Sequence, residues 1–139
     1  MKYLLDTNII SELIKPTPNS NVVSFLDSLN EDDVFISVIT IGEIQFGIQK
    51  LPSSKKKEQL LSWLYADLLA RFHNKVVDID VETMLLWGEV SQQLKAKGTP
   101  MPIMDLLIAA TCLKGNYMLI TRNEKDFTHL DIEITNPFR

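Results

Sequence analysis

Lys2-Tyr3-Leu4-Leu5-Asp6-Thr7-Asn8 is the stretch that decides the fold, because an apolar run ends there abruptly in an acid, a hydroxyl and an amide. A short run that is apolar on both sides, without alternation, is typical of a strand covered on both faces, as in a parallel sheet. In open parallel sheets, ligands bind beyond the carboxyl ends of the strands. We therefore predict a buried first strand that delivers Asp6 to the ligand-binding edge.

The composition predicts one globular domain spanning residues 1–139, since 45% of the 139 residues are hydrophobic and can form a sizeable core. No window is long and apolar enough for a membrane span, and no basic segment precedes an apolar signal core. We therefore expect a cytoplasmic protein without a membrane partner. Cys112 is the only cysteine, which excludes an internal disulfide and a thiolate metal cluster. The net charge of -4 argues against a protein that coats nucleic acid, but it permits a local basic patch.

Strand-like and helix-like segments alternate along the chain, which predicts an α/β domain with a mostly parallel sheet. Strands are predicted at Lys2–Leu5, Val34–Ile39, Val76–Ile79 and Tyr117–Thr121, with an edge strand at Ile132–Ile134. Helices are predicted over residues 9–15, after Asn19 or Ser20, from Thr40, from Ser53 or Ser54, from Asp80 to before Gly98, and from Asp105 to Gly115.

Acidic residues follow these strands at the points where the chain turns. Asp6 follows the first strand, Glu43 lies in the first turn of the helix after the second, and Asp105 begins an apolar helix. Asp126 lies in the segment 122–126 that follows the fourth strand. If the strands are parallel, all of these positions lie along one edge of the sheet.

Each acid also has a purely structural interpretation. The segment Thr40–Glu43 matches a capping box. Asp6 and Asp105 have the position of ordinary helix N-caps, and Asp126 alone is typical of a solvated turn. Their joint placement favours chemistry instead, because carboxylates about 4 Å apart repel by about 4 kcal/mol per pair at an effective dielectric constant of about 20. Such a cluster needs protons or a cation, and oxygen ligands without His or Cys select magnesium (Mg2+) or manganese (Mn2+) over zinc.

Four segments of the chain together resemble the signatures of PIN-domain proteins, and more narrowly of VapC- and FitB-type toxins of type II toxin-antitoxin operons. The resemblance covers essentially the whole chain. The four segments are residues 6–8, 37–43, 104–110 and 121–127.

The resemblance implies a three-layer α/β/α sandwich and a metal-dependent endoribonuclease that is restrained by a cognate antitoxin. It also implies a homodimer that meets operator DNA only through the antitoxin. It assigns Asp6 and Asp105 as metal ligands and Glu43 as the third catalytic acid, which helps to orient the attacking water. Asn8 and Thr121 would then hold the carboxylates by hydrogen bonds.

The chain departs from the family pattern at the fourth acidic position, where many members have an aspartate and this chain has Asn123. Asp126, three residues later, either replaces that acid or caps the turn. The number of metal ions is therefore open between one and two, because a neutral amide binds magnesium far less well than a carboxylate.

An acidic pocket that takes RNA also needs nearby cations. The candidates are Lys50, Lys55, Lys56, Lys57, Arg122 and Lys125, although a solvated helix face is the more ordinary role for the lysine run. An apolar groove lined by the helices after Asn19 and Ser53 would suit an antitoxin tail.

Two other functions are compatible with parts of the sequence. Asp6 has the position of a phosphoacceptor in an aspartyl phosphotransfer domain, but the haloacid dehalogenase pattern requires a second aspartate where this chain has Asn8. A PIN scaffold that has lost catalysis and acts only by binding the antitoxin and operator DNA is favoured by Asn123 alone. Asp6, Glu43 and Asp105 favour an active enzyme.

Overall fold

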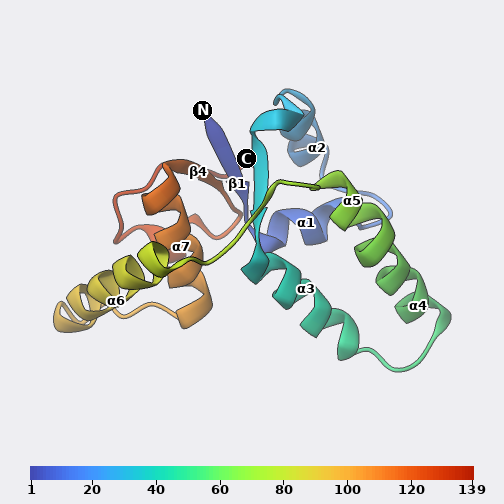
Figure 1. Ribbon diagram of the computed structural model, residues 1–139. Helices are drawn as coiled ribbons and strands as arrows, with labels where there is room; N and C mark the ends of the chain where they lie inside the picture. The colour runs from blue at the N-terminus through green and yellow to red at the C-terminus, as the bar shows by residue number, and fades with distance from the viewer.

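Five parallel strands form the centre of the protein, whose computed structural model describes residues 1–139 (Figure 1). The sheet order is β3-β2-β1-β4-β5, so the first strand lies in the middle and β5 at an edge. The predicted parallel α/β sheet is confirmed. The strands are β1 (Lys2–Leu5), β2 (Val34–Ser37), β3 (Val76–Val77), β4 (Tyr117–Ile120) and β5 (Ile134–Thr135).

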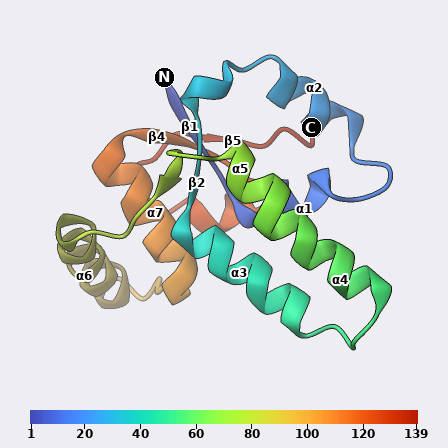
Figure 2. The same ribbon diagram turned by 45° about the vertical axis from the view of Figure 1, so that its right-hand side comes forward.

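Helices cover both faces of the sheet, as Figures 1 and 2 show, and the implied three-layer sandwich is confirmed. None of the helices is long and apolar enough to cross a lipid bilayer. One face carries α1 (Thr7–Leu13), α2 (Ser20–Asp27), α3 (Val38–Gln49), α4 (Lys55–Ser62), the π-helical η2 (Trp63–Leu68) and α5 (Leu69–Arg71). The other carries α6 (Val81–Ala96), α7 (Ile103–Gly115) and the 3-10 turn η3 (Glu124–Phe127), and a further 3-10 turn, η1 (Glu31–Asp33), precedes β2.

The sequence of β1 explains why helices must cover both faces of the sheet. Its side chains alternate between the faces, so that Leu5 packs into the cluster under α1 and α3 while Leu4 packs into the cluster under α6 and α7. Both leucines are buried. A strand that is apolar at consecutive positions is stable only when helices cover it on both sides.

The strand register brings three polar residues to one level at the carboxyl edge of the sheet. Leu5 is paired with Ile36 on β2 and with Ile120 on β4. The next residues along these strands are Asp6, Ser37 and Thr121, all of them buried.

The start of α3 differs from the sequence prediction. Ser37 caps this helix, because its hydroxyl accepts a hydrogen bond from the Ile39 N–H at 3.0 Å. The helix therefore begins at Val38, and Thr40 lies inside it. The predicted capping box at Thr40–Glu43 is wrong, since a local serine cap overrides the β-branched character of the following residues.

The N-cap interpretation of the other two acids has opposite outcomes. Asp6 does cap α1, accepting a hydrogen bond from the Thr7 N–H at 2.8 Å. Asp105 does not cap α7, because that helix begins at Ile103 after Pro102, and no side chain caps it. Asp105 lies in the first turn instead, and its carboxylate makes no capping hydrogen bond.

Candidate active site

A pocket of about 380 Å³ opens at the carboxyl edge of the sheet, and no apolar residue lines it. The predicted acids from β1, α3 and α7 lie in it together, which confirms that they converge. Its lining consists of Asp6, Thr7, Asn8, Ser11, Glu12, Lys15, Glu43, Asp105, Arg122 and Asn123.

Asp6 is the most constrained of these acids. Its main-chain N–H donates to the Ile120 carbonyl at 2.9 Å, which extends the β1–β4 ladder by one residue. Its Oδ2 accepts hydrogen bonds from the Thr121 hydroxyl at 2.8 Å and from Asn8 Nδ2 at 3.2 Å. Burial nevertheless raises the pKa of Asp6, because desolvation outweighs these hydrogen bonds.

Glu43 reaches the pocket from α3 through a contact with α1. The Thr7 hydroxyl donates to Glu43 Oε1 at 2.6 Å and lies 3.1 Å from the Thr40 hydroxyl. Glu43 therefore does not reach back to cap its own helix. The hydroxyl of Thr7 fixes one oxygen of Glu43 and leaves the other open to the pocket.

Asp105 is half-buried on the far side of the pocket. Burial, followed by the negative charges of Asp6, Asp126 and Glu43 in that order, raises its pKa to about 6. The acids are thus close enough to repel one another. The pocket favours either a proton or a cation at Asp105.

Asn8 and Thr121 connect the two ends of the site. Asn8 Nδ2 also donates to the Thr121 hydroxyl at 3.2 Å, and Asn8 Oδ1 accepts from the Arg122 N–H at 3.0 Å. The Thr121 hydroxyl accepts in turn from the Asn123 N–H at 3.0 Å. This network joins β1 to the loop after β4.

The side chain of Asp126 forms no hydrogen bond and does not line the pocket, so of its two predicted roles the turn cap is wrong, and replacement of the fourth acid stays a prediction. Only its backbone N–H is bonded, to the Asn123 carbonyl at 3.0 Å. Its negative charge adds to the effects of burial and of Asp6, which raise the pKa of Asp105. Asn123 itself lines the pocket.

The comparison with known families decides the identity of the fold. The PIN domain family matches residues 3–133, which is nearly the whole chain. The chain belongs to the PIN-domain family.

Among curated PIN relatives, the chain is 34% identical to Toxin FitB of Neisseria gonorrhoeae over 135 residues, covering 97% of each sequence. It is also 34% identical to Ribonuclease VapC2 of Rickettsia felis over 130 residues, covering 94% of this chain and 92% of the relative. Among solved structures, it superposes with a TM-score of 0.82 on VapBC2 from Rickettsia felis bound to a DNA fragment from their promoter, at 32% identity and 98% coverage of each chain.

Sequence reasoning missed four polar residues of this PIN site: Thr7, Ser11, Glu12 and Lys15. Glu12 is buried on α1, where its carboxylate accepts hydrogen bonds from Lys15 Nζ at 2.8 Å and from the Asn19 N–H at 2.9 Å. One signal was available, because a glutamate in place of an apolar residue on the buried face of a helix needs a specific partner.

The predicted cations are mostly absent from the pocket. Of the six candidates only Arg122 lines it. The other cation in the lining, Lys15, was not among the candidates. Lys57 Nζ instead donates to the Gln49 and Leu51 carbonyls at the end of α3, and the ammonium group of Lys50 lies 5.3 Å from the Phe46 ring centroid. The lysine run is therefore not part of the acidic pocket.

The donor set of the pocket fits a hard cation. Its side chains offer carboxylate, amide and hydroxyl oxygens, and neither His nor Cys is present. No three of the acids approach closely enough to form a ligand cage by themselves. Asp6 and Asp105 are the carboxylates whose raised pKa values a cation would relieve, and two carboxylates plus water is the coordination that magnesium commonly accepts.

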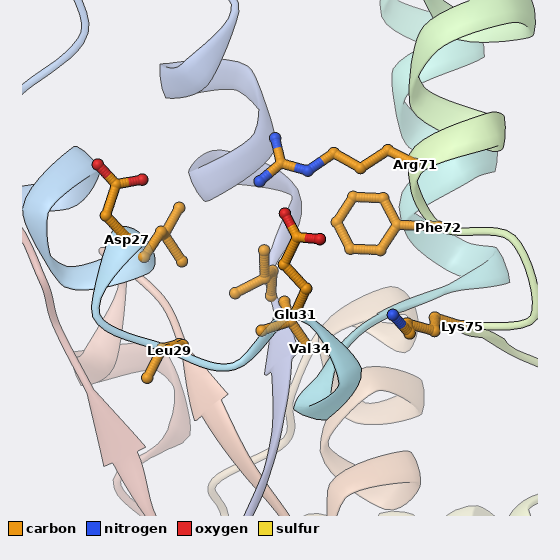
Figure 3. Close-up of a pocket in the computed structure, with 9 residues that line it drawn as sticks. Asp27, Leu29, Glu31, Val34, Arg71, Phe72 and Lys75 are labelled. Carbon is orange, nitrogen blue, oxygen red and sulfur yellow. The ribbon is translucent and has the colours of Figure 1, made fainter.

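An apolar groove of about 640 Å³ lies next to the acidic pocket, between α1 and α4, and shares Ser11 and Lys15 with it. A hollow of about 260 Å³ continues it through Leu13, Ile14 and Trp63. Beyond α5 a third pocket, of about 130 Å³, shares Arg71 and Phe72 with this hollow and has Asp27 of α2 on its other wall (Figure 3). Of the two helices predicted to line the groove, α4 does so, whereas the prediction for α2 is wrong because α1 forms the other wall.

Proposed function

We propose that this PIN domain is the toxin of a type II toxin-antitoxin system and acts as a metal-dependent endoribonuclease. One observation carries the proposal: Asp6, Glu43 and Asp105, from three separate elements, line one open pocket without an apolar residue. The relatives named as a toxin and as a ribonuclease match the chain over nearly its full length, which supports the same activity here.

In this proposal Asp6 and Asp105 hold Mg2+, or Mn2+ in its place. The ion, when bound, supplies a water of lowered pKa and offsets the charge on the phosphoryl oxygens. Thr121, directly after β4, and Asn8, two residues after Asp6, orient the Asp6 carboxylate by hydrogen bonds to its Oδ2. This support fixes the position of Asp6 before the substrate arrives.

Glu43 orients the attacking water in the same proposal. The Thr7 hydroxyl holds one of its oxygens at 2.6 Å, so the other can accept a hydrogen bond from water or take its proton. Because Thr7 directly follows Asp6, the orientation of Glu43 is tied to the position of the metal-binding carboxylate.

The groove between α1 and α4 is the proposed binding site of the antitoxin. It is about 640 Å³ in volume, contains Leu13, Ile14, Leu60 and Trp63, and leads directly into the acidic pocket. A peptide that fills it covers the route by which RNA enters. The related VapBC2 complex is bound to promoter DNA, and we propose that this chain meets its operator in the same way, through the antitoxin.

A PIN domain that has lost catalysis and acts only by binding is the second candidate. Asn123 favours it, because an amide replaces the usual fourth carboxylate in the pocket lining. The raised pKa of Asp105 favours the nuclease, since an acidic site kept only for binding an antitoxin has no need of mutual repulsion among its carboxylates.

Cleavage of total RNA by the purified chain tests the two candidates. The wild type is compared with Asp6→Ala and Asp105→Asn, each with magnesium and with excess chelator. We expect discrete cleavage products from the wild type only with metal, and a loss of at least about 100-fold in rate for both variants. If all three proteins behave alike, the nuclease proposal is wrong and the binding module takes its place. The cut sites of an active wild type identify the RNA.

A further inference from the structure

Arg122 is a cation of the acidic pocket without a contacting acid, although its charge, after Lys15, lowers the pKa of Glu12. It lines the pocket, yet it forms no ion pair. The nearby acid Glu124 is paired with Arg139 instead, and it accepts a hydrogen bond from Asn136 Nδ2 at 3.5 Å. The other cation of the pocket, Lys15, is bonded to Glu12. Arg122 is therefore the cation whose charge is available to a ligand.

The segment after β5 holds this arginine in place. The guanidinium carbon of Arg122 lies 4.7 Å from the centroid of the Phe138 ring. A guanidinium that contacts a ring in this way is held by its face, and its N–H groups keep their capacity to donate in the plane. The Arg122 backbone is fixed as well, through its N–H on Asn8 Oδ1 and its carbonyl on Asn136 Nδ2 at 3.3 Å.

Phe138 is itself anchored from three directions. Its N–H donates to Asn136 Oδ1 at 3.0 Å, and its carbonyl accepts from Asn21 Nδ2 at 3.5 Å. Its ring is partly buried against the core cluster on the α1 and α3 face of the sheet. Phe138 thus contacts α2, the segment after β5 and Arg122 of the pocket.

We propose that Arg122 binds a phosphate of the substrate strand beside the acidic pocket and that Phe138 is the residue that positions it. The inference rests on the proposed cleavage of RNA and assigns the group that brings the anionic strand to an acidic site. A guanidinium matches two phosphate oxygens at once, and this geometry compensates for the repulsion between the phosphate and Asp6, Glu43 and Asp105.

Equilibrium binding of RNA measures the role of Arg122. The probe is a fluorescein-labelled single-stranded RNA of mixed sequence, titrated with the full chain in chelator at several salt concentrations. For Arg122→Ala we expect about tenfold weaker binding, because a charge-assisted contact is lost, and a salt slope smaller by about 0.7. The matched control is Lys97→Ala, which removes one positive charge from an exposed position at the end of α6. If the two variants bind alike, Arg122 does not contact the phosphate.

Two further variants separate positioning from general stability. Arg122→Lys keeps the charge but loses the planar group, so we expect the wild-type salt slope with weaker binding. Phe138→Leu removes the ring and is expected to weaken binding about threefold in the wild type but not further in Arg122→Ala, whereas Phe138→Tyr binds normally. An equal loss from Phe138→Leu in both backgrounds would assign Phe138 a structural role and overturn its role as a positioning residue.

Cleavage kinetics distinguish this inference from the proposed function. In magnesium, we expect Arg122→Ala to raise KM about tenfold with kcat little changed, because the contact holds substrate and transition state alike. A wild type that cleaves RNA while Arg122→Ala has normal KM and affinity overturns the inference alone. A wild type that binds RNA through Arg122 but never cleaves it overturns the nuclease proposal and leaves the phosphate contact intact.

Discussion

Thr121 shows how one buried hydroxyl organises the acidic edge. It donates to Asp6 Oδ2 and accepts hydrogen bonds from Asn8 Nδ2 and from the Asn123 N–H. Its side chain is fully buried. The position of the Asp6 carboxylate therefore depends on a residue that is 115 positions away in sequence.

Replacement of this hydroxyl is expected to be costly. Thr121→Val leaves Asp6 without one of its hydrogen bonds in a buried site, which is expected to lower the free energy of unfolding by about 2 kcal/mol and to slow RNA cleavage. Thr121→Ser is the control, because it keeps the hydroxyl. Urea denaturation measures the change, and a Val variant as stable as the Ser variant contradicts the role given to this hydrogen bond.

The Asp105 carboxyl makes stability depend on pH. Its folded-state pKa is about 6, above the ordinary value of 3.8, so folding favours its protonated form. The stability it contributes is fully present below about pH 3.8 and is lost as the pH rises through about 6. Above that pH the metal-free protein carries an unfavourable charge at this position.

Asp105→Asn is therefore expected to stabilise the metal-free protein while it abolishes cleavage. At pH 7.5 in chelator, we expect a Tm higher by roughly 3 °C, with solvent screening of a half-exposed carboxyl allowed for, and no difference near pH 4. Magnesium should raise the Tm of the wild type but not of the variant. Thermal unfolding followed by circular dichroism gives these Tm values. A variant that is less stable than the wild type at pH 7.5 contradicts the repulsion between Asp105 and the other acids of the pocket.

At the scale of elements, α1 connects the two functional surfaces. Its first residues, Thr7 and Asn8, hold the acids, and its last residue, Leu13, lines the groove towards α4 together with the C-cap Ile14. Lys15 belongs to both surfaces. A partner that occupies the groove therefore lies against the same helix that holds Asp6 and Glu43.

A charge placed in the groove should separate inhibition from catalysis. We expect Ile14→Asp to weaken binding of the antitoxin by about 10- to 100-fold, because a carboxylate would be buried against Leu13, Leu60 and Trp63. RNA cleavage should stay within about twofold of the wild type, because Ile14 does not line the acidic pocket. Ala96→Asp, at an exposed position on α6, is the control. Calorimetric titration with the antitoxin measures the affinity. Equal values for the two variants contradict antitoxin binding in this groove.

At the scale of the whole molecule, α6 presents an unpartnered apolar stripe. Val81 is 75% exposed and Leu85 is 69% exposed, and Met84 lies between them. The spacing of these residues places them on one face of the helix. Exposed apolar side chains gathered in this way are typical of an interface between proteins.

The homodimer implied by the family resemblance is expected to use this stripe. Leu85→Asp should convert a dimer of the wild type into a monomer, as measured by light scattering after size-exclusion chromatography, without loss of helical content. Glu89→Asp, which keeps the charge of an exposed residue one turn further along α6, serves as the control. A variant that remains dimeric would place the interface elsewhere.

The sequence by itself determined the sheet, the order of its strands along the chain, and the set of acids at one edge. Those features follow from local patterns: apolar runs give strands, caps and prolines give helix ends, and parallel strands present their carboxyl ends together. The tertiary structure alone decided that Thr7 holds Glu43, that α3 begins before Thr40, and that the groove lies between α1 and α4. It alone also brought Arg122 onto Phe138 and raised the pKa of Asp105. The physical reason is that these features depend on distances and burial among residues far apart in the chain, and no local pattern encodes either quantity.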